Sequence, residues 1–303
     1  MTDRGPRRIA VTGATGFIGS ALVARLAAGG HTVHRISRSA PAPGSGDVRW
    51  DPARGELDPR ALEGVDAVVH LAGENIGQRW TAAARRRIVD SRVQGTTLLA
   101  RTLATLERKP RVLVSVSAVG IYGDTGDRVV DESSPPGTGF LADVVRAWER
   151  SADAAREAGI RVVHPRLGVV LGAGGGALAR MLLPFHLGVG GRIGSGRQWM
   201  SWIAHSDAVR ALETLATRDG PAGPVNVAAP PVTNADFTRA LGRALHRPTI
   251  IPIPALALRA IYGRMAVETL IAGQRAASRR MGEMGVELDW TGVEEALREE
   301  LRV

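Results

Sequence analysis

The residues best suited to chemistry lie near the N-terminus, where three glycines spaced three residues apart follow a short apolar stretch. Glycine lets the backbone turn sharply and approach a diphosphate closely. The helix expected after the third glycine would offer free N–H groups and a positive dipole to the phosphates. The spacing therefore predicts a dinucleotide-binding loop, with a purely structural glycine turn as the alternative. The residues predicted to form it are Gly13, Thr15, Gly16, Phe17, Ile18 and Gly19.

The end of the second predicted strand indicates which dinucleotide binds. Proteins that bind NAD usually carry Asp or Glu there, which accepts a hydrogen bond from the ribose 2′-hydroxyl. This chain has Ser37 and Arg38 instead, and the next acidic residue is Asp47. A guanidinium binds phosphate oxygens through a planar fork of N–H donors, which suits a 2′-phosphate. The sequence predicts NADP(H) rather than NAD(H), with a solvated Arg38 as the alternative.

Two further strand ends are predicted to contact the cofactor. Leu71, Ala72 and Gly73 end one predicted strand, and the small residues there would let a cofactor lie across the edge of the sheet. Ser115 lies in the next predicted strand and points to the same face as Ser117, because side chains alternate along a strand. Ser115 is therefore placed with the cofactor-binding residues.

These residues require alternating strands and helices to position them. The predicted strands are 8–12, 31–37, 65–73, 111–123 (with its loop) and 160–172, and the predicted helices include 80–107 and 140–158. Such alternation predicts an α/β protein with a Rossmann-type, doubly wound parallel sheet covered on both faces. Ligands of such sheets bind at the carboxyl ends of the strands.

After Gly172 the pattern changes to glycine-rich segments around a short helix, and helical patterns dominate from Asn234 onward. We expect a dinucleotide-binding domain over residues 1–230, with cap insertions at about 173–204. Residues 231–303 are expected to form a smaller, mostly helical C-terminal cap. No flexible linker separates the two, so the cap should pack on the main sheet.

Composition excludes several classes of protein. The formal net charge is +9, yet aromatic residues make up only 4%, so nucleic-acid binding is not expected. No cysteine is present, which excludes disulfides and thiolate metal sites, and the histidines show no ligand spacing, so no metal is expected. No apolar run is long enough to span a membrane and the start shows no secretory signal. We expect a cytoplasmic protein without a membrane partner; a homodimer is compatible with the sequence.

The chain resembles the extended short-chain dehydrogenase/reductase superfamily, through the T-G-x-x-G-x-x-G loop, the L-A-G turn and the V-S-x-S-A-x-x-x-Y-G segment. It is similar in particular to the atypical epimerase family branch. The supporting segments are HLAGENI, DSRVQGT, SVSAVGIYGDTG, FLADVVRAWE, GRIGSGRQWMSWI and PVTNADFTRALGRALHRP, and together they span nearly the whole chain. The last of them looks like the family-specific C-terminal module.

The resemblance implies a missing catalytic pair. Typical members use a Ser or Thr, a Tyr as general acid and base, and a Lys four residues after the Tyr. Alignment on Glu149 puts Leu141 at the Tyr position and Val145 at the Lys position, and the chain contains no Tyr-x-x-x-Lys, since Lys109 is its sole lysine. Leucine carries no proton, so the standard mechanism is not available.

Candidates remain for the missing proton donor and for a substrate pocket. Ser117 matches the superfamily's catalytic serine, and Tyr122 could donate a proton if a nearby Arg lowers its pKa. Their alternatives are a strand-end serine and a packing tyrosine. Arg92 stands where extended members often place an Asn, and could hold a carboxylate or phosphate, with a solvated arginine as the alternative. The predicted substrate pocket comprises Glu74, Arg92, Gln198, Ser201 and Trp202.

Two functions fit these residues. The first is an NADP(H)-dependent oxidoreductase or epimerase-like enzyme that acts on a small polar substrate. The second is a non-catalytic NADP(H)-binding redox sensor or interaction protein, which would keep the cofactor loop without the catalytic pair.

Overall fold

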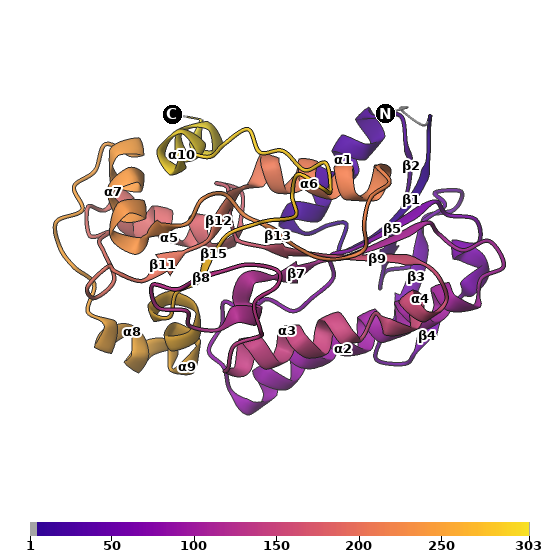
Figure 1. Cartoon of the computed structure of the whole chain (residues 1–303), viewed down its shortest axis with the longest axis horizontal. Helices are drawn as coiled ribbons and strands as arrows, with labels where there is room; N and C mark the ends of the chain where they lie inside the picture. The colour runs from indigo at the N-terminus through magenta and orange to yellow at the C-terminus, as the bar shows by residue number, and fades with distance from the viewer. Residues whose placement is uncertain (1–4, 303) are drawn as a thin grey trace.

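A parallel sheet forms the centre of the computed structural model, which describes residues 5–302 (Figure 1). All neighbouring strands from β13 to β3 are parallel, and only β4 runs antiparallel to its neighbour. In spatial order the strands are β13 (Gly223–Val227), β9 (Arg161–Leu167), β6 (Val112–Ser115), β5 (Ala67–His70), β1 (Arg8–Thr12), β2 (Thr32–Ser37), β3 (Val48–Asp51) and β4 (Glu56–Leu57). The short β7 (Ser117–Ala118) pairs with β9.

Helices cover both faces of the sheet, as the alternating pattern predicts. On one face the apolar sides of α1 (Phe17–Ala28) and α6 (His205–Thr217) pack on the central strands. On the other face lie α2 (Ala82–Thr105), α3 (Phe140–Arg150), α4 (Asp153–Glu157) and the 3-10 turn η1 (Pro59–Leu62) (Figure 1). The predicted Rossmann-type architecture is confirmed.

Several local predictions were too simple. The stretch 160–172 was expected as one strand, but the chain leaves the sheet at Gly168, where a Cβ would lie 2.9 Å from the backbone of Ser201. The released segment forms β10 (Val169–Leu171), which pairs with β12 (Trp202–Ala204). The predicted helix 140–158 is divided into α3 and α4, and β3 was not anticipated. Beyond β7 the chain forms the 3-10 turn η2 (Val119–Tyr122).

The C-terminal region is mainly helical and is joined to the rest of the chain by short strand pairs. Strand β14 (Val232–Thr233) pairs with β11 (Trp199–Met200), and β15 (Arg275–Ala276) pairs with β8 (Val129–Val130). The helical elements are α5 (Gly176–His186), α7 (Asn234–Ala244), α8 (Ala255–Tyr262), α9 (Arg264–Ala266), the π-helical turn η3 (Val267–Ile271) and α10 (Val293–Leu301). A division at residue 230 stays an expectation.

The ends of the chain limit two of the predictions. Residues 1–4, on which the expectation of no secretory signal partly rests, lie outside the described residues, as does Val303 of the predicted cap. Within residues 5–302, none of the helices has both the length and the apolar character needed to cross a bilayer.

Candidate functional site

The glycine-rich loop is a turn in which side chains would have no room. Gly13 has a φ of +66°, and the Gly16 N–H donates to the Gly13 carbonyl over 3.0 Å. A Cβ at Gly19 would collide with the same carbonyl oxygen, and a Cβ at Gly13 would lie 3.0 Å from the backbone of Leu71 and Ala72. The turn therefore requires glycine, and it leaves its backbone accessible to a close-lying ligand.

Helix α1 begins directly after this turn with uncapped N–H groups. Its N-cap residue is Gly16, which has no side chain to accept from them, and its first turn contains no acidic residue. The N–H groups of Phe17, Ile18 and Gly19 and the helix dipole therefore form an electropositive cradle, with the composition expected for a diphosphate site. The loop fits the cofactor that the sequence predicts.

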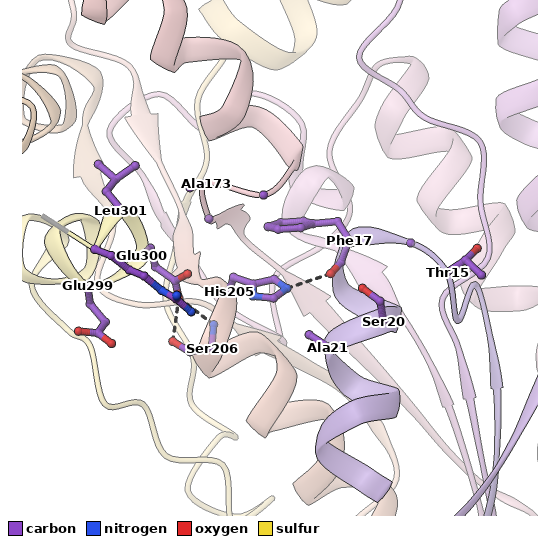
Figure 2. A pocket seen from close by; sticks show the side chains of 14 residues that line it. Thr15, Phe17, Ser20, Ala21, Ala173, His205, Ser206, Glu299, Glu300 and Leu301 are labelled. Atoms are coloured by element: carbon purple, nitrogen blue, oxygen red, sulfur yellow. Dashed lines mark hydrogen bonds between the residues drawn. The ribbon is translucent and has the colours of Figure 1, made fainter. Parts of the chain in front are cut away.

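A cavity of about 930 Å³ opens beside the N-terminus of α1. Figure 2 shows Phe17 and His205 on one side of it and the end of α10 on another, with Thr15 and Ser20 on α1 and its loop. The rings of Phe17 and His205 stack with centroids 4.2 Å apart, and His205 Nε2 lies 3.0 Å from the Phe17 carbonyl oxygen. Because a carbonyl only accepts, Nε2 carries the proton. This pair stiffens the wall beside the predicted diphosphate site.

A buried Thr12 joins the glycine loop to the turn after β5. Its Oγ1 accepts the N–H groups of Leu71 at 3.0 Å and Ala72 at 3.2 Å, and lies 2.7 Å from His70 Nδ1. With both lone pairs occupied, the hydroxyl proton goes to Nδ1, so His70 Nε2 carries a proton and donates to Thr96 over 2.9 Å. Burial lowers the pKa of His70 to about 4, which keeps this ring neutral. This series of hydrogen bonds holds the backbone of Leu71 and Ala72, two of the predicted cofactor contacts, in place.

The predicted ribose site has no competing carboxylate. Ser37 ends β2 and its Oγ donates to Ser39 at 3.4 Å, while Arg38 follows it on the surface. The nearest acid in sequence, Asp47, accepts the backbone N–H of Arg35 over 2.9 Å and so serves to hold the loop. Arg38 forms no ion pair with another described residue and is available to a phosphate, which agrees with the residue types at this strand end.

Arg92 carries a positive charge to the edge of the sheet. It projects from α2, donates to the carbonyls of Glu74 at 3.0 Å and Ile88 at 3.3 Å, and lies over the ring of Trp148. Its guanidinium carbon lies 3.3 Å from where a Cβ of Gly73 would be. Burial lowers the pKa of Arg92 to about 10, against the opposing effect of Glu74, so the group stays protonated at neutral pH. It can bind an anionic group here.

Glu74 is held at the surface end of the same region. Its Oε1 accepts from Gln78 over 2.9 Å and lies 3.5 Å from Arg87, and its side chain remains partly exposed. Gly77, in the same loop, accepts a hydrogen bond from Arg180 of α5, which ties the loop to the C-terminal side of the site. Glu74 is therefore a rim residue.

Three other residues of the predicted substrate pocket make packing contacts instead. Trp202 is completely buried, and Ser201 is buried and donates to the Gln274 carbonyl over 2.9 Å. Gln198 donates to the Leu270 carbonyl over 3.1 Å. The polar atoms of all three are thus used by backbone carbonyls of other segments, and their place in a substrate pocket stays a prediction. The glycines beside them suggested a flexible wall, whereas the neighbouring backbone uses their polar atoms.

The two candidate catalytic hydroxyls belong to one buried hydrogen-bond network. Ser117 Oγ donates to Glu149 over 2.7 Å, and Glu149 binds Arg166 through both carboxylate oxygens at 2.8 and 2.9 Å. Arg166 also donates to the Tyr122 hydroxyl over 2.9 Å, and that hydroxyl donates to Asn226 over 2.8 Å. The network links β7, α3, β9, η2 and β13 at the carboxyl edge of the sheet.

Within this network Tyr122 does not meet the condition set for a proton donor. Its side chain is 1% exposed. Burial raises the pKa of Tyr122, and the opposing effect of Arg166 does not reverse that direction. The hypothesis required a pKa lowered by a nearby arginine; the arginine is present, but desolvation outweighs it. The position suits a packing and hydrogen-bonding role.

Replacing Tyr122 by Phe should lower the free energy of unfolding by about 1–3 kcal/mol, because Arg166 and Asn226 would each lose a buried partner. Urea denaturation followed by circular dichroism measures this. Tyr262→Phe is the matched control, since that tyrosine is exposed. Equal midpoints for both variants and the unmodified protein would contradict the role of the hydroxyl in stability.

The positions of the missing Tyr and Lys are apolar and packed. Val145 is buried with Ile121 and Tyr122, and Leu141 packs against a cluster around Trp80. Close by on the sheet, the buried Ser115 Oγ has no hydrogen-bond partner among the described residues. The Ser115 hydroxyl therefore has hydrogen-bonding capacity left for a ligand, which fits the predicted contact with the cofactor.

From the sequence, Glu149 served only to align the family's catalytic positions, and no role was predicted for Arg166. A signal for both existed, because Arg166 lies within a predicted strand of the central sheet, and a charge buried there requires a partner. The pairing of Thr12 with His70 was also missed. Each precedes a glycine-containing turn at the end of adjacent strands, and that shared position was the available clue.

Comparison with known proteins agrees with this fold. Residues 9–228 match the NAD dependent epimerase/dehydratase family. An epimerase family protein of Mycobacterium bovis is 47% identical over 291 residues, which cover 95% of this chain and 96% of the relative. The chain therefore belongs to the NAD dependent epimerase/dehydratase family, in the branch of epimerase family proteins, as the resemblance predicts.

Solved structures give the same result. The human epimerase family protein SDR39U1, crystallised with NADPH, is 37% identical and superposes with a TM-score of 0.87, covering 97% of this chain and 99% of its own. MoeE5, in complex with UDP-glucuronic acid and NAD, is 24% identical with a TM-score of 0.77, covering 97% of this chain and 98% of its own. That second likeness shows the fold alone.

Proposed function

We propose that this chain binds NADP(H) with its diphosphate on the Gly13–Gly19 loop and its 2′-phosphate on Ser37 and Arg38. The observation that carries the proposal is the uncapped N-terminus of α1, directly after β1. Arg38 follows the neighbouring strand β2, and the next acid in the sequence, Asp47, accepts from the backbone of Arg35. The NADPH named with the human relative supports the choice of the phosphorylated cofactor. When bound, this cofactor supplies or accepts a hydride.

We further propose that the bound cofactor serves an oxidoreductase or epimerase-like reaction on a small polar substrate. Arg92 would anchor an anionic group of the substrate beside Gly73, because its charge is held there by backbone carbonyls and the Trp148 ring. Ser117 could donate to a substrate carbonyl by rotating its hydroxyl away from Glu149. Leu141 and Val145 would exclude water from the reacting face.

A non-catalytic NADP(H) sensor is the second candidate, and a specific observation favours it. The hydroxyl protons of Ser117 and Tyr122 are both directed at other members of the buried network, so no proton donor of this network faces a ligand in this conformation. Consumption of NADPH with a panel of small carbonyl compounds separates the two candidates. Turnover that falls in Ser117→Ala supports the enzyme, and binding without turnover supports the sensor.

Replacing Arg38 by Ala tests the cofactor assignment. Loss of a charge-assisted contact to the 2′-phosphate should weaken NADPH binding by about 1.5–3 kcal/mol and leave NADH binding nearly unchanged. Isothermal titration of both nucleotides measures the change. Arg86→Ala, on the exposed side of α2, is the control for a general loss of positive charge. Equal losses for NADPH and NADH in Arg38→Ala would refute the assignment.

A further inference from the structure

Exposed apolar side chains gather at one end of the molecule. Of the ten large hydrophobic residues that are exposed within residues 5–302, nine lie between positions 183 and 267. Helix α8 has the sequence ALALRAIY, and none of its residues is buried. A surface helix normally buries its apolar face, so such a helix has a surface without a partner in the chain.

Two segments form this surface together. Ile253 N–H donates to the Arg192 carbonyl over 2.8 Å, Gly194 N–H donates to the Ile253 carbonyl over 2.9 Å, and Arg247 donates to the His186 carbonyl over 3.1 Å. We call residues 183–194 and 247–262 the apolar tip. Figure 1 places the elements that carry it, α5 and α8, at the end of the molecule opposite β2 and β3.

The segments at this end of the molecule are also rich in arginine. The stretches 176–204 and 237–267 contain eight arginines and no aspartate or glutamate. Three of these arginines pair with carboxylates from outside the two stretches. The remaining five have no salt bridge among the described residues: Arg180, Arg192, Arg197, Arg247 and Arg259.

We propose that the apolar tip docks on the surface of a negatively charged phospholipid bilayer. Ile250 is 86% exposed and Leu256 is 75% exposed, so both side chains protrude from the surface and do not line a groove. Protruding aliphatic side chains can insert among lipid acyl chains. Tyr262, on the same tip, is a residue type favoured at membrane interfaces. Arg192, Arg247 and Arg259, the arginines of the tip itself, would meet the lipid phosphates.

Other occupants fit less well. A second copy of the chain would bring arginines against arginines, with no acidic residue in either stretch to pair them. A folded acidic protein would need a groove shaped to receive the protruding side chains. The sequence predicted no membrane partner because no apolar run could span a bilayer, but a segment that lies in the interface does not need that length.

Sedimentation of the full chain with vesicles tests the proposal. It should bind vesicles of phosphatidylcholine mixed with phosphatidylglycerol, release with added salt, and bind phosphatidylcholine alone weakly. Replacing Ile250 and Ile251 together by Ser should reduce binding to the mixed vesicles at least about tenfold, since burial of one large aliphatic side chain is worth roughly one order of magnitude in affinity. Arg259→Gln should weaken binding severalfold and reduce its salt dependence.

Matched variants separate docking by the tip from attraction to a cationic protein. Val129→Ser replaces an exposed aliphatic residue elsewhere, and Arg86→Gln removes an exposed charge from α2. Both should bind as the unmodified chain does, and circular dichroism should show all variants folded. The proposal is overturned if no vesicle binds, or if the Val129 and Ile250/Ile251 variants lose binding equally. It is also overturned if the chain sediments as a dimer that the Ile250/Ile251 variant dissociates, because the tip would then join two copies.

Discussion

Replacing Glu149 by Ala is expected to lower the free energy of unfolding by about 3–5 kcal/mol. Both residues of its pair with Arg166 are nearly buried, and removing one partner leaves a charge without compensation in a medium of low polarity. Burial alone would raise the pKa of Glu149, yet the bonds from Arg166 hold it below its ordinary value. The carboxylate is therefore ionised in the folded protein, and Ser117 would also lose its acceptor.

Chemical denaturation at neutral pH measures this effect, with Glu157→Ala as the control. Glu157 lies on the exposed side of α4, so its removal should change stability by less than about 0.5 kcal/mol. Adding Arg166→Met to Glu149→Ala should restore part of the lost stability, because the uncompensated guanidinium disappears. A double variant no more stable than Glu149→Ala would show that the loss has another origin.

Lowering the pH should reduce the free energy of unfolding, because His70 stays neutral in the folded protein. Burial, assisted by the positive charge of Arg92, lowers the pKa of His70 from its ordinary value of 6.5 to about 4. Between these values the unfolded chain binds a proton that the folded chain does not, so this group's contribution is fully present above pH 6.5 and is lost as the pH falls towards 4. The shift corresponds to about 3 kcal/mol.

Denaturant titrations at several pH values between 6.5 and 4 measure how steeply the free energy of unfolding falls with pH. His70→Gln cannot take up a proton there, so its stability should fall less steeply with acidification than that of the unmodified chain. The buried His164, whose pKa burial also lowers, should keep part of the slope in that variant. His34→Gln replaces a partly buried histidine on β2 and serves as the control. Identical slopes for His70→Gln and the unmodified chain would contradict the proposed neutral ring.

Only part of the site followed from the sequence. The Gly13–Gly19 turn and the strand end at Arg38 were predictable because their conformations depend on a few neighbouring residues. The role of the predicted substrate wall stays a prediction. Ser201 and Trp202 were expected to line a substrate pocket beside flexible glycines. In the structure their polar atoms donate to backbone carbonyls of other segments, which local sequence does not reveal.

The sequence by itself determined the doubly wound sheet, the cofactor loop and the absence of a Tyr-x-x-x-Lys pair. The loop and the missing pair depend on residue types and spacing within one stretch of chain, and the sheet depends on the alternation of strand and helix patterns along it. Only the tertiary structure decided that Ser117 and Tyr122 share a network with Glu149 and Arg166, and that α8 is left without a partner. The physical reason is that these features arise between segments up to about a hundred residues apart, where the order of the strands and the packing of helices select the neighbours.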